Sequence, residues 1–147
     1  MKRWIFFFLF LTLIIYPFKR VLADEPSQII ITVLSASSEG SEFDLDNDAY
    51  RDKLIKLFSY TSYHQITQKK VSLQKSEDET LSLPQNYKLL LSLKAKEKER
   101  IVVQAIIQKG GQKLLDTSLS ILKPGTVFLG GPSFEKGVLV LVLEAVQ

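Results

Sequence analysis

Cysteine is absent from this chain, and histidine occurs only once among its 147 residues. The lack of thiols excludes a disulfide framework, a thiolate metal site and a lipid-anchored N-terminal cysteine. A single histidine also argues against a zinc site, which usually takes at least two ligands from histidine or cysteine. We therefore expect no metal and no cofactor, and a fold that depends on its hydrophobic core. The absence of cysteine favours a bacterial envelope protein over a small eukaryotic secreted module.

The chain has no excess of positive charge outside its N-terminus. Its formal net charge is +3, but the first 23 residues contain four cations and no acidic residue. The remaining residues carry 15 lysines and arginines against 16 acidic residues, a net charge of −1. Nucleic-acid binding requires a basic surface that neutralises phosphates. We therefore expect no nucleic-acid partner.

The first 23 residues have the layout of a secretory signal peptide. Two basic residues precede a nearly unbroken apolar run at residues 4–18, and Ala23 provides a small residue for cleavage. The run has 15 residues, whereas a membrane-spanning helix needs about 20, so we predict cleavage between Ala23 and Asp24. An uncleaved anchor at residues 4–18 is the first alternative, with the basic pair at residues 19–20 as its stop signal. A buried cytosolic helix is the second.

Residues 24–147 have the length and composition of a single β-rich globular domain, and they contain no repeats. Residues Tyr50, Leu54 and Phe58 fall at helical spacing and predict one helix at about residues 47–58. Apolar alternation and short β-branched runs predict seven strands, at residues 28–37, 59–75, 87–96, 101–109, 112–123, 126–130 and 137–146.

Short turns in the second half of the chain favour antiparallel hairpins, and a glycine pair at residues 110–111 suits one of them. The last predicted strand is apolar on both faces, so we expect it to be central and covered on both sides. The fold class is therefore α+β: a mostly antiparallel β-sheet or sandwich of about seven strands, with one helix between the first and second strands.

The glycine-rich stretch GGPSFEKG, at residues 130–137, most resembles a ligand-binding loop. A phosphate-binding loop requires lysine followed by serine or threonine and then a helix, and this stretch has neither. We predict a bulged connection between two antiparallel strands, with Phe134 as a contact residue at its tip.

Acidic residues alternate in DLDND, residues 44–48, as they do at the start of a calcium-binding loop. That motif needs glycine at its sixth position and glutamate at its twelfth, where this chain has Ala49 and Ile55. The sequence favours a solvated helix start with Asp46 or Asn47 as N-cap. A weaker cation site is the alternative.

His64 would have to carry any Ser-His-Asp triad, but the chain has no G-x-S-x-G elbow. We therefore expect a surface or half-buried histidine. Tyr60 and Tyr63 lie in the hydroxyl-rich stretch SYTSY and predict a contact surface, because tyrosine combines apolar area with hydrogen bonding. For Tyr60 itself, the sequence favours packing under the helix over a place in such a surface.

Asp116 and Glu144 are acidic residues within predicted strands. An isolated strand carboxylate normally points to solvent, but two that faced one cleft could act as the acid and base of a hydrolase. No other catalytic constellation is present in the sequence.

These observations favour a non-enzymatic, exported accessory or binding protein of the cell envelope, either periplasmic or secreted. We expect it to contact another envelope protein through its sheet edges and through Tyr60, Tyr63 and Phe134. Membrane contact would arise only through residues 4–18, if they are not removed. The alternatives are a carboxylate-dependent hydrolase and a membrane-tethered structural subunit of an envelope complex.

Overall fold

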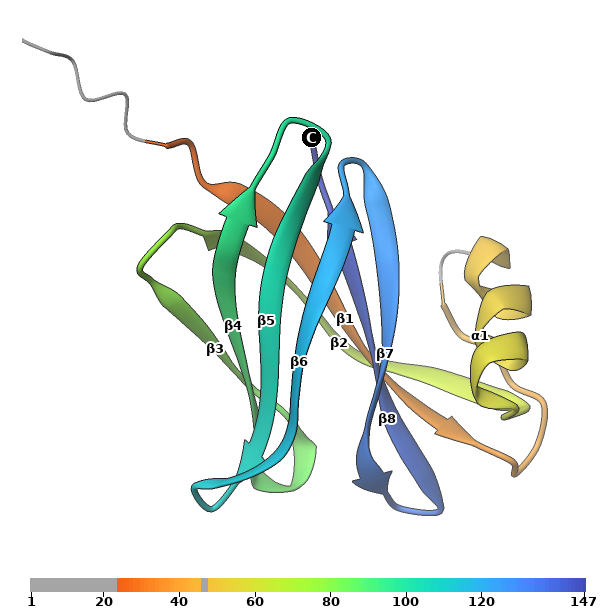
Figure 1. Cartoon of the computed structure of the whole chain (residues 1–147). Helices are drawn as coiled ribbons and strands as arrows, with labels where there is room; N and C mark the ends of the chain where they lie inside the picture. The colour runs from red at the N-terminus through yellow and green to blue at the C-terminus, as the bar shows by residue number, and fades with distance from the viewer. Residues whose placement is uncertain (1–23, 46–47) are drawn as a thin grey trace, which may run out of the picture.

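The computed structural model describes residues 24–45 and 48–147, which form two β-sheets packed face to face (Figure 1). One α-helix, α1 (Arg51–Phe58), lies between the first two strands and follows the 3-10 turn η1 (Asp48–Tyr50). A second such turn, η2 (Pro84–Asn86), precedes β4. The strands are β1 (Ser27–Ser37), β2 (Ser62–Leu73), β3 (Asp78–Ser82), β4 (Tyr87–Lys96), β5 (Arg100–Lys109), β6 (Gln112–Leu122), β7 (Gly125–Phe134) and β8 (Gly137–Ala145).

Two predictions fall on residues that the structure does not describe. The signal peptide at residues 1–23 is one, and the N-cap at Asp46 or Asn47 is the other. Helix α1 itself begins at Arg51, after η1, and ends at Phe58 as expected. Among the described residues, no helix has both the length and the apolar character needed to cross a membrane.

The first sheet has the strand order β2-β1-β8-β7, and the second has the order β3-β4-β5-β6. All neighbouring strands are antiparallel. This arrangement confirms the predicted α+β sandwich with its helix between the first two strands. The additional strand is β3, which forms where a polar connection was expected. Its Leu81 packs against the core while Asp78 and Ser82 are exposed, so a single leucine carries the apolar pattern.

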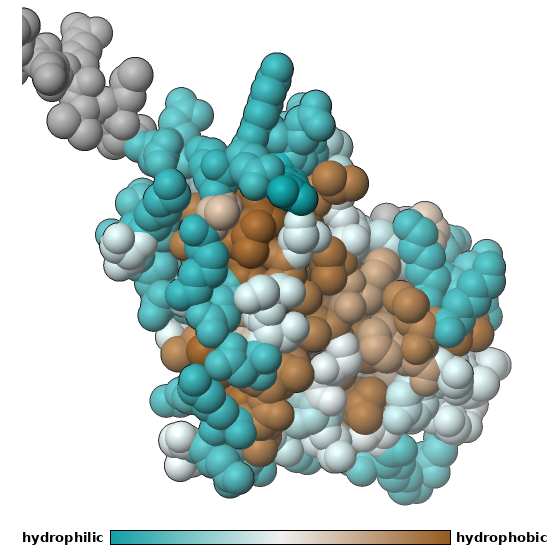
Figure 2. All heavy atoms as spheres, in the orientation of Figure 1, coloured by the Kyte–Doolittle hydropathy of each residue, from teal (hydrophilic) through white to brown (hydrophobic). Residues whose placement is uncertain are grey.

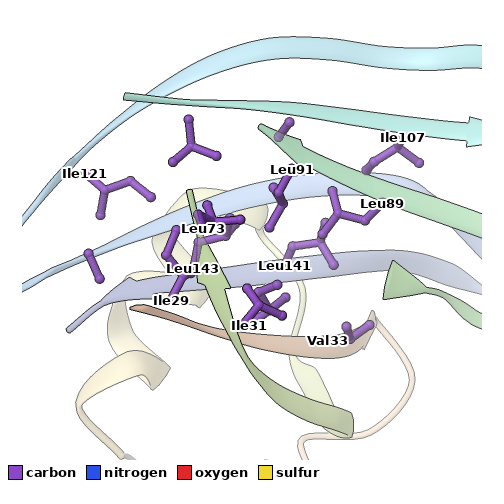
Figure 3. Close-up of a cluster of buried hydrophobic side chains, with 14 of the residues drawn as sticks. Ile29, Ile31, Val33, Leu73, Leu89, Leu91, Ile107, Ile121, Leu141 and Leu143 are labelled. Carbon is purple, nitrogen blue, oxygen red and sulfur yellow. The ribbon is translucent and has the colours of Figure 1, made fainter. Parts of the chain in front are cut away.

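The main core lies between the sheets and consists of alternate residues of facing strands (Figure 3). Ile29, Ile31 and Val33 of β1 point toward Leu89 and Leu91 of β4 in this layer. Successive strand residues point to opposite faces, so the even-numbered residues of β1 face away from this core. The alternation seen in the sequence therefore sorts each strand into a core face and an outer face.

A second cluster of buried side chains covers the outer face of the first sheet, beneath α1 (Figure 1). Leu54 is its only fully buried contribution from the helix. Tyr63 of β2 is also fully buried there, and its hydroxyl donates a hydrogen bond to the Leu54 carbonyl at 2.8 Å. Burial raises the pKa of the Tyr63 hydroxyl. β8 contributes to both layers and is central in its sheet, which confirms the prediction of a strand covered on both sides.

Candidate functional site

A pocket lies at one end of the first sheet, where β1 ends and β8 begins. There β1 and β2 run beyond the second sheet (Figure 1). The inner face of the first sheet is not covered by the second sheet here, and it forms a pocket of about 410 Å³. Its lining includes Ser35, Ser37, Glu39, His64, Phe134 and Lys136. The pocket therefore combines hydroxyls, both signs of charge, an imidazole and an aromatic ring.

The β7–β8 hairpin forms one wall of this pocket. β7 continues to Phe134, which pairs with Gly137, so the turn is shorter than the predicted connection and consists of residues 135 and 136. The expected bulge is present as a register shift between Gly130 and Ser133. Phe134 is half-buried: it packs against the main core and also lines the pocket. Its ring is thus held in place rather than free at a loop tip.

An ion pair joins this hairpin to the opposite wall. Lys136 Nζ donates to Glu39 Oε1 at 2.7 Å. Both side chains are largely exposed, and exposed ion pairs contribute only about 0–1 kcal/mol. The contact therefore orients the pocket wall more than it stabilises the fold.

His64 lies on the other side of the pocket, among three polar groups. Its Nδ1 is 3.1 Å from Asp44 Oδ2, and its Nε2 is 3.2 Å from Glu42 Oε2 and 3.3 Å from Ser62 Oγ. The structure thus places Ser62, His64 and Asp44 in the order of a Ser-His-Asp triad, which the sequence did not reveal. Asp44 is 20 residues away and lies on an irregular segment, so no spacing rule connects it to the histidine.

This cluster lacks the access that a nucleophilic triad requires. Ser62 is 1% exposed, whereas a nucleophile must reach a substrate carbonyl. Nε2 also faces the Glu42 carboxylate, which can only accept a hydrogen bond from it. Nε2 is therefore not free to accept the hydroxyl proton of Ser62. The contacts instead tie the segment at residues 42–44 to β2, alongside the Tyr63 N–H bond to the Glu42 carbonyl at 2.8 Å.

Asp44 makes two of the contacts that hold this segment against β2. Its Oδ1 accepts the Gln65 backbone N–H at 2.7 Å, while Oδ2 contacts His64. Partial burial opposes ionisation of the carboxyl, but the hydrogen bonds from Gln65 and His64 outweigh it, so the pKa of Asp44 lies below its usual value. Because the folded-state pKa is the lower one, the stabilisation is complete above the unfolded-state pKa and is lost as the pH falls through the folded-state value.

We expect the Gln65 amide to report this titration. In an NMR pH series its chemical shift should change with a midpoint below 3.8, the ordinary value for aspartate. His64→Gln should raise the midpoint, because it removes the positive charge of the imidazole but leaves the Gln65 contact. A midpoint at or above 3.8 in the unaltered protein would contradict the assigned hydrogen bonds.

The three predicted contact residues do not share one surface. Phe134 faces the pocket on the inner side of the first sheet. Tyr60 is half-buried on the outer side, where it packs against the cluster beneath α1, as the favoured interpretation of this residue expected. Tyr63 is fully buried in that cluster, so its side chain is not available to a partner.

Asp116 and Glu144 also lie apart. Asp116 is on the outer face of the second sheet, where it accepts hydrogen bonds from Gln104 at 2.8 Å and Lys113 at 3.2 Å. Glu144 is on the outer face of the first sheet and accepts a hydrogen bond from the Tyr50 hydroxyl at 3.2 Å. The two sheets and the main core between them separate the carboxylates, so they cannot act on one substrate.

Within residues 24–45 and 48–147, no group of three or more histidine, cysteine or acidic residues is placed to hold a metal ion. The class of protein is an antiparallel β-sandwich with one covering helix and a polar pocket at one end. Comparison of the chain with protein-family models, with curated proteins and with solved structures finds no match.

Proposed function

We propose that this chain is a non-enzymatic, exported binding protein of the cell envelope that contacts another envelope protein through the pocket and the β7–β8 hairpin. The observation that carries this proposal is the pairing of a positioned aromatic ring, Phe134, with an open hollow of mixed polarity. Aromatic anchors surrounded by adaptable polar groups are typical of protein interfaces. Loops and turns held by a rigid sandwich commonly carry such sites.

The placement of the strand ends supports the same proposal. Ile29, near the start of β1, pairs with Ala145, near the end of β8, so the start of β1 and the end of β8 lie at one end of the sandwich. The pocket lies at the other end, where β1 finishes and β8 begins. A partner that binds the pocket therefore approaches the end of the sandwich opposite the start of β1.

A photoreactive amino acid at position 135 tests the contact. Glu135 is exposed at the hairpin turn and lines the pocket. In cells that produce the protein, we expect illumination to yield one discrete heterologous adduct. Phe134→Leu should strongly reduce that adduct, because leucine keeps the apolar contact with the core but removes the aromatic ring.

The matched control places the same photoreactive residue at Lys94, which is exposed on β4 of the second sheet. This site should give no adduct with the same partner. Equal labelling from positions 94 and 135, or no adduct above background from position 135, would count against the pocket as a contact site.

The mass of the exported protein tests its localisation. A chain that begins at Asp24 is expected if residues 1–23 are a cleaved signal peptide. A mature chain that still begins at Met1 would favour the membrane-tethered subunit instead.

A further inference from the structure

The free edges of the two sheets differ in how they are protected against pairing with another strand. Exposed edges invite such pairing, and proteins block it with short strands, bulges, charges or proline. On β2, residue 43 pairs with Tyr63, a bulge follows, and Lys69 and Lys70 are exposed. β3 has only five residues and an acidic start. β7 is interrupted between Gly130 and Ser133, and Pro132 lies within the interruption.

β6 has none of these protections along most of its length. From Leu115 to Leu122 it pairs with β5 without a register shift, and no described strand pairs with its other side. Asp116 is the only charged residue in this stretch. Two large apolar side chains, Leu114 and Leu122, are 48% and 64% exposed beside it. Hydrophobic side chains gather over β5 and β6 and on the side toward β7 (Figure 2).

The sequence of β6 is close to symmetrical about Ser118. Leu114 and Leu122 lie four residues to either side, and Leu115 and Ile121 lie three residues to either side. In an antiparallel pair of identical strands centred on one residue, positions equally distant from that centre face one another. Centring the pair on Ser118 therefore brings Leu115 of each copy opposite Ile121 of the other, within the stretch that pairs with β5 without a register shift.

We propose that β6 pairs antiparallel with β6 of a second copy of this chain, about a two-fold axis at Ser118, to form one continuous eight-stranded sheet. The axis makes the contact isologous, so every contact across it is made twice. This surface is distinct from the pocket, and neither proposal depends on the other.

The polar residues of β6 suit this register. Asp116 faces Ser120 of the second copy, so a carboxylate that only accepts hydrogen bonds meets a hydroxyl that can donate. No like charges face one another between Leu115 and Ile121. Lys113 lies beyond the register shift, where it forms a 3.2 Å ion pair with Asp116.

A single pair of edge strands buries little surface, and contacts below about 1,200 Å² are typical of transient association. The dimer should therefore be weak and readily reversible. We expect analytical ultracentrifugation of the protein, from about 5 to 500 μM, to show a monomer–dimer equilibrium. A monomer throughout this range would overturn the proposal.

A charge exchange at Ser118 tests the register. Ser118 is exposed and faces its own copy across the axis, so Ser118→Lys should place two lysines together and weaken dimerisation at least tenfold. Ser118→Asp should do the same, and an equimolar mixture of the two variants should dimerise again. Thr80→Lys, on the exposed face of edge strand β3, is the matched control and should dimerise like the unaltered protein. Absence of rescue in the mixture would overturn this register.

The lack of cysteine allows a second readout. Facing residues in antiparallel strands have Cα atoms about 4.5–5.5 Å apart, which is within the range of a disulfide. Ser118→Cys should therefore form a covalent dimer on mild oxidation, and Thr80→Cys should not do so at the same concentration. Equal cross-linking of the two variants would indicate random collision and would count against the pairing.

Discussion

Replacing Leu54 by alanine is expected to lower the free energy of unfolding by about 3 kcal/mol, within the range for leucine-to-alanine changes in a packed core. Leu54 is the only fully buried residue of α1 in the second cluster, against which Phe58 packs as well. The substitution removes apolar contact with Tyr63 and β8 and leaves a cavity that an eight-residue helix cannot easily fill. Urea denaturation followed by far-ultraviolet circular dichroism measures the change.

Leu57→Ala is the matched control for this prediction. It makes the same chemical change three residues later in the same helix, but Leu57 is 60% exposed. Surface substitutions of this kind usually change stability by no more than about 0.5 kcal/mol. The difference between the two variants therefore isolates burial from helix propensity. Similar losses for both would mean that α1 is held by its own helicity rather than by the cluster beneath it.

Most of the fold could be predicted because burial imposes a period on the sequence. Alternating strands such as β4 and β5 show one core face, while β8 shows two because a sheet and a helix cover its opposite sides. β3 was missed because only Leu81 carries its pattern. A single apolar residue among polar neighbours does not distinguish a short edge strand from a loop.

The orientation of β2 could not be predicted, because a bulge changes its phase. Before the bulge, His64 faces the pocket side of the sheet, whereas after it Val71 and Leu73 face the main core. Even-numbered residues thus face inward at one end and odd-numbered residues at the other. Tyr63 therefore faces the outer side of the sheet, opposite to Val71 and Leu73, and the cluster beneath α1 buries it there.

The pocket was also beyond the reach of sequence patterns. Phe134 was predicted as a contact residue from its place in a glycine-rich turn, and it does line the hollow. Its neighbours there, Glu39 and His64, come from a loop and a strand far away in the chain. Only the pairing of β1 with both β2 and β8 brings them together.

The seating of the β7–β8 hairpin depends on Gly137, for reasons of space. A Cβ atom built at this position would lie 1.8 Å from the Ala36 carbonyl oxygen and 2.8 Å from its carbonyl carbon. Both are backbone atoms of β1, so they cannot turn aside as a flexible side chain would. The absence of a side chain is what allows the start of β8 to approach β1, and with it places Phe134 and Lys136 against the pocket.

Gly137→Ala is therefore expected to lower the free energy of unfolding by about 2–3 kcal/mol, as overpacked substitutions do, and to move the hairpin away from β1. The adduct from position 135 should be lost with it, because the pocket wall is displaced. Lys136→Ala breaks only the exposed ion pair with Glu39 and should cost no more than about 1 kcal/mol. Equal losses for the two variants, measured by urea denaturation, would assign the seating of the hairpin to the ion pair. A larger loss for Gly137→Ala would assign it to the close approach of the two backbones, on which the pocket then depends.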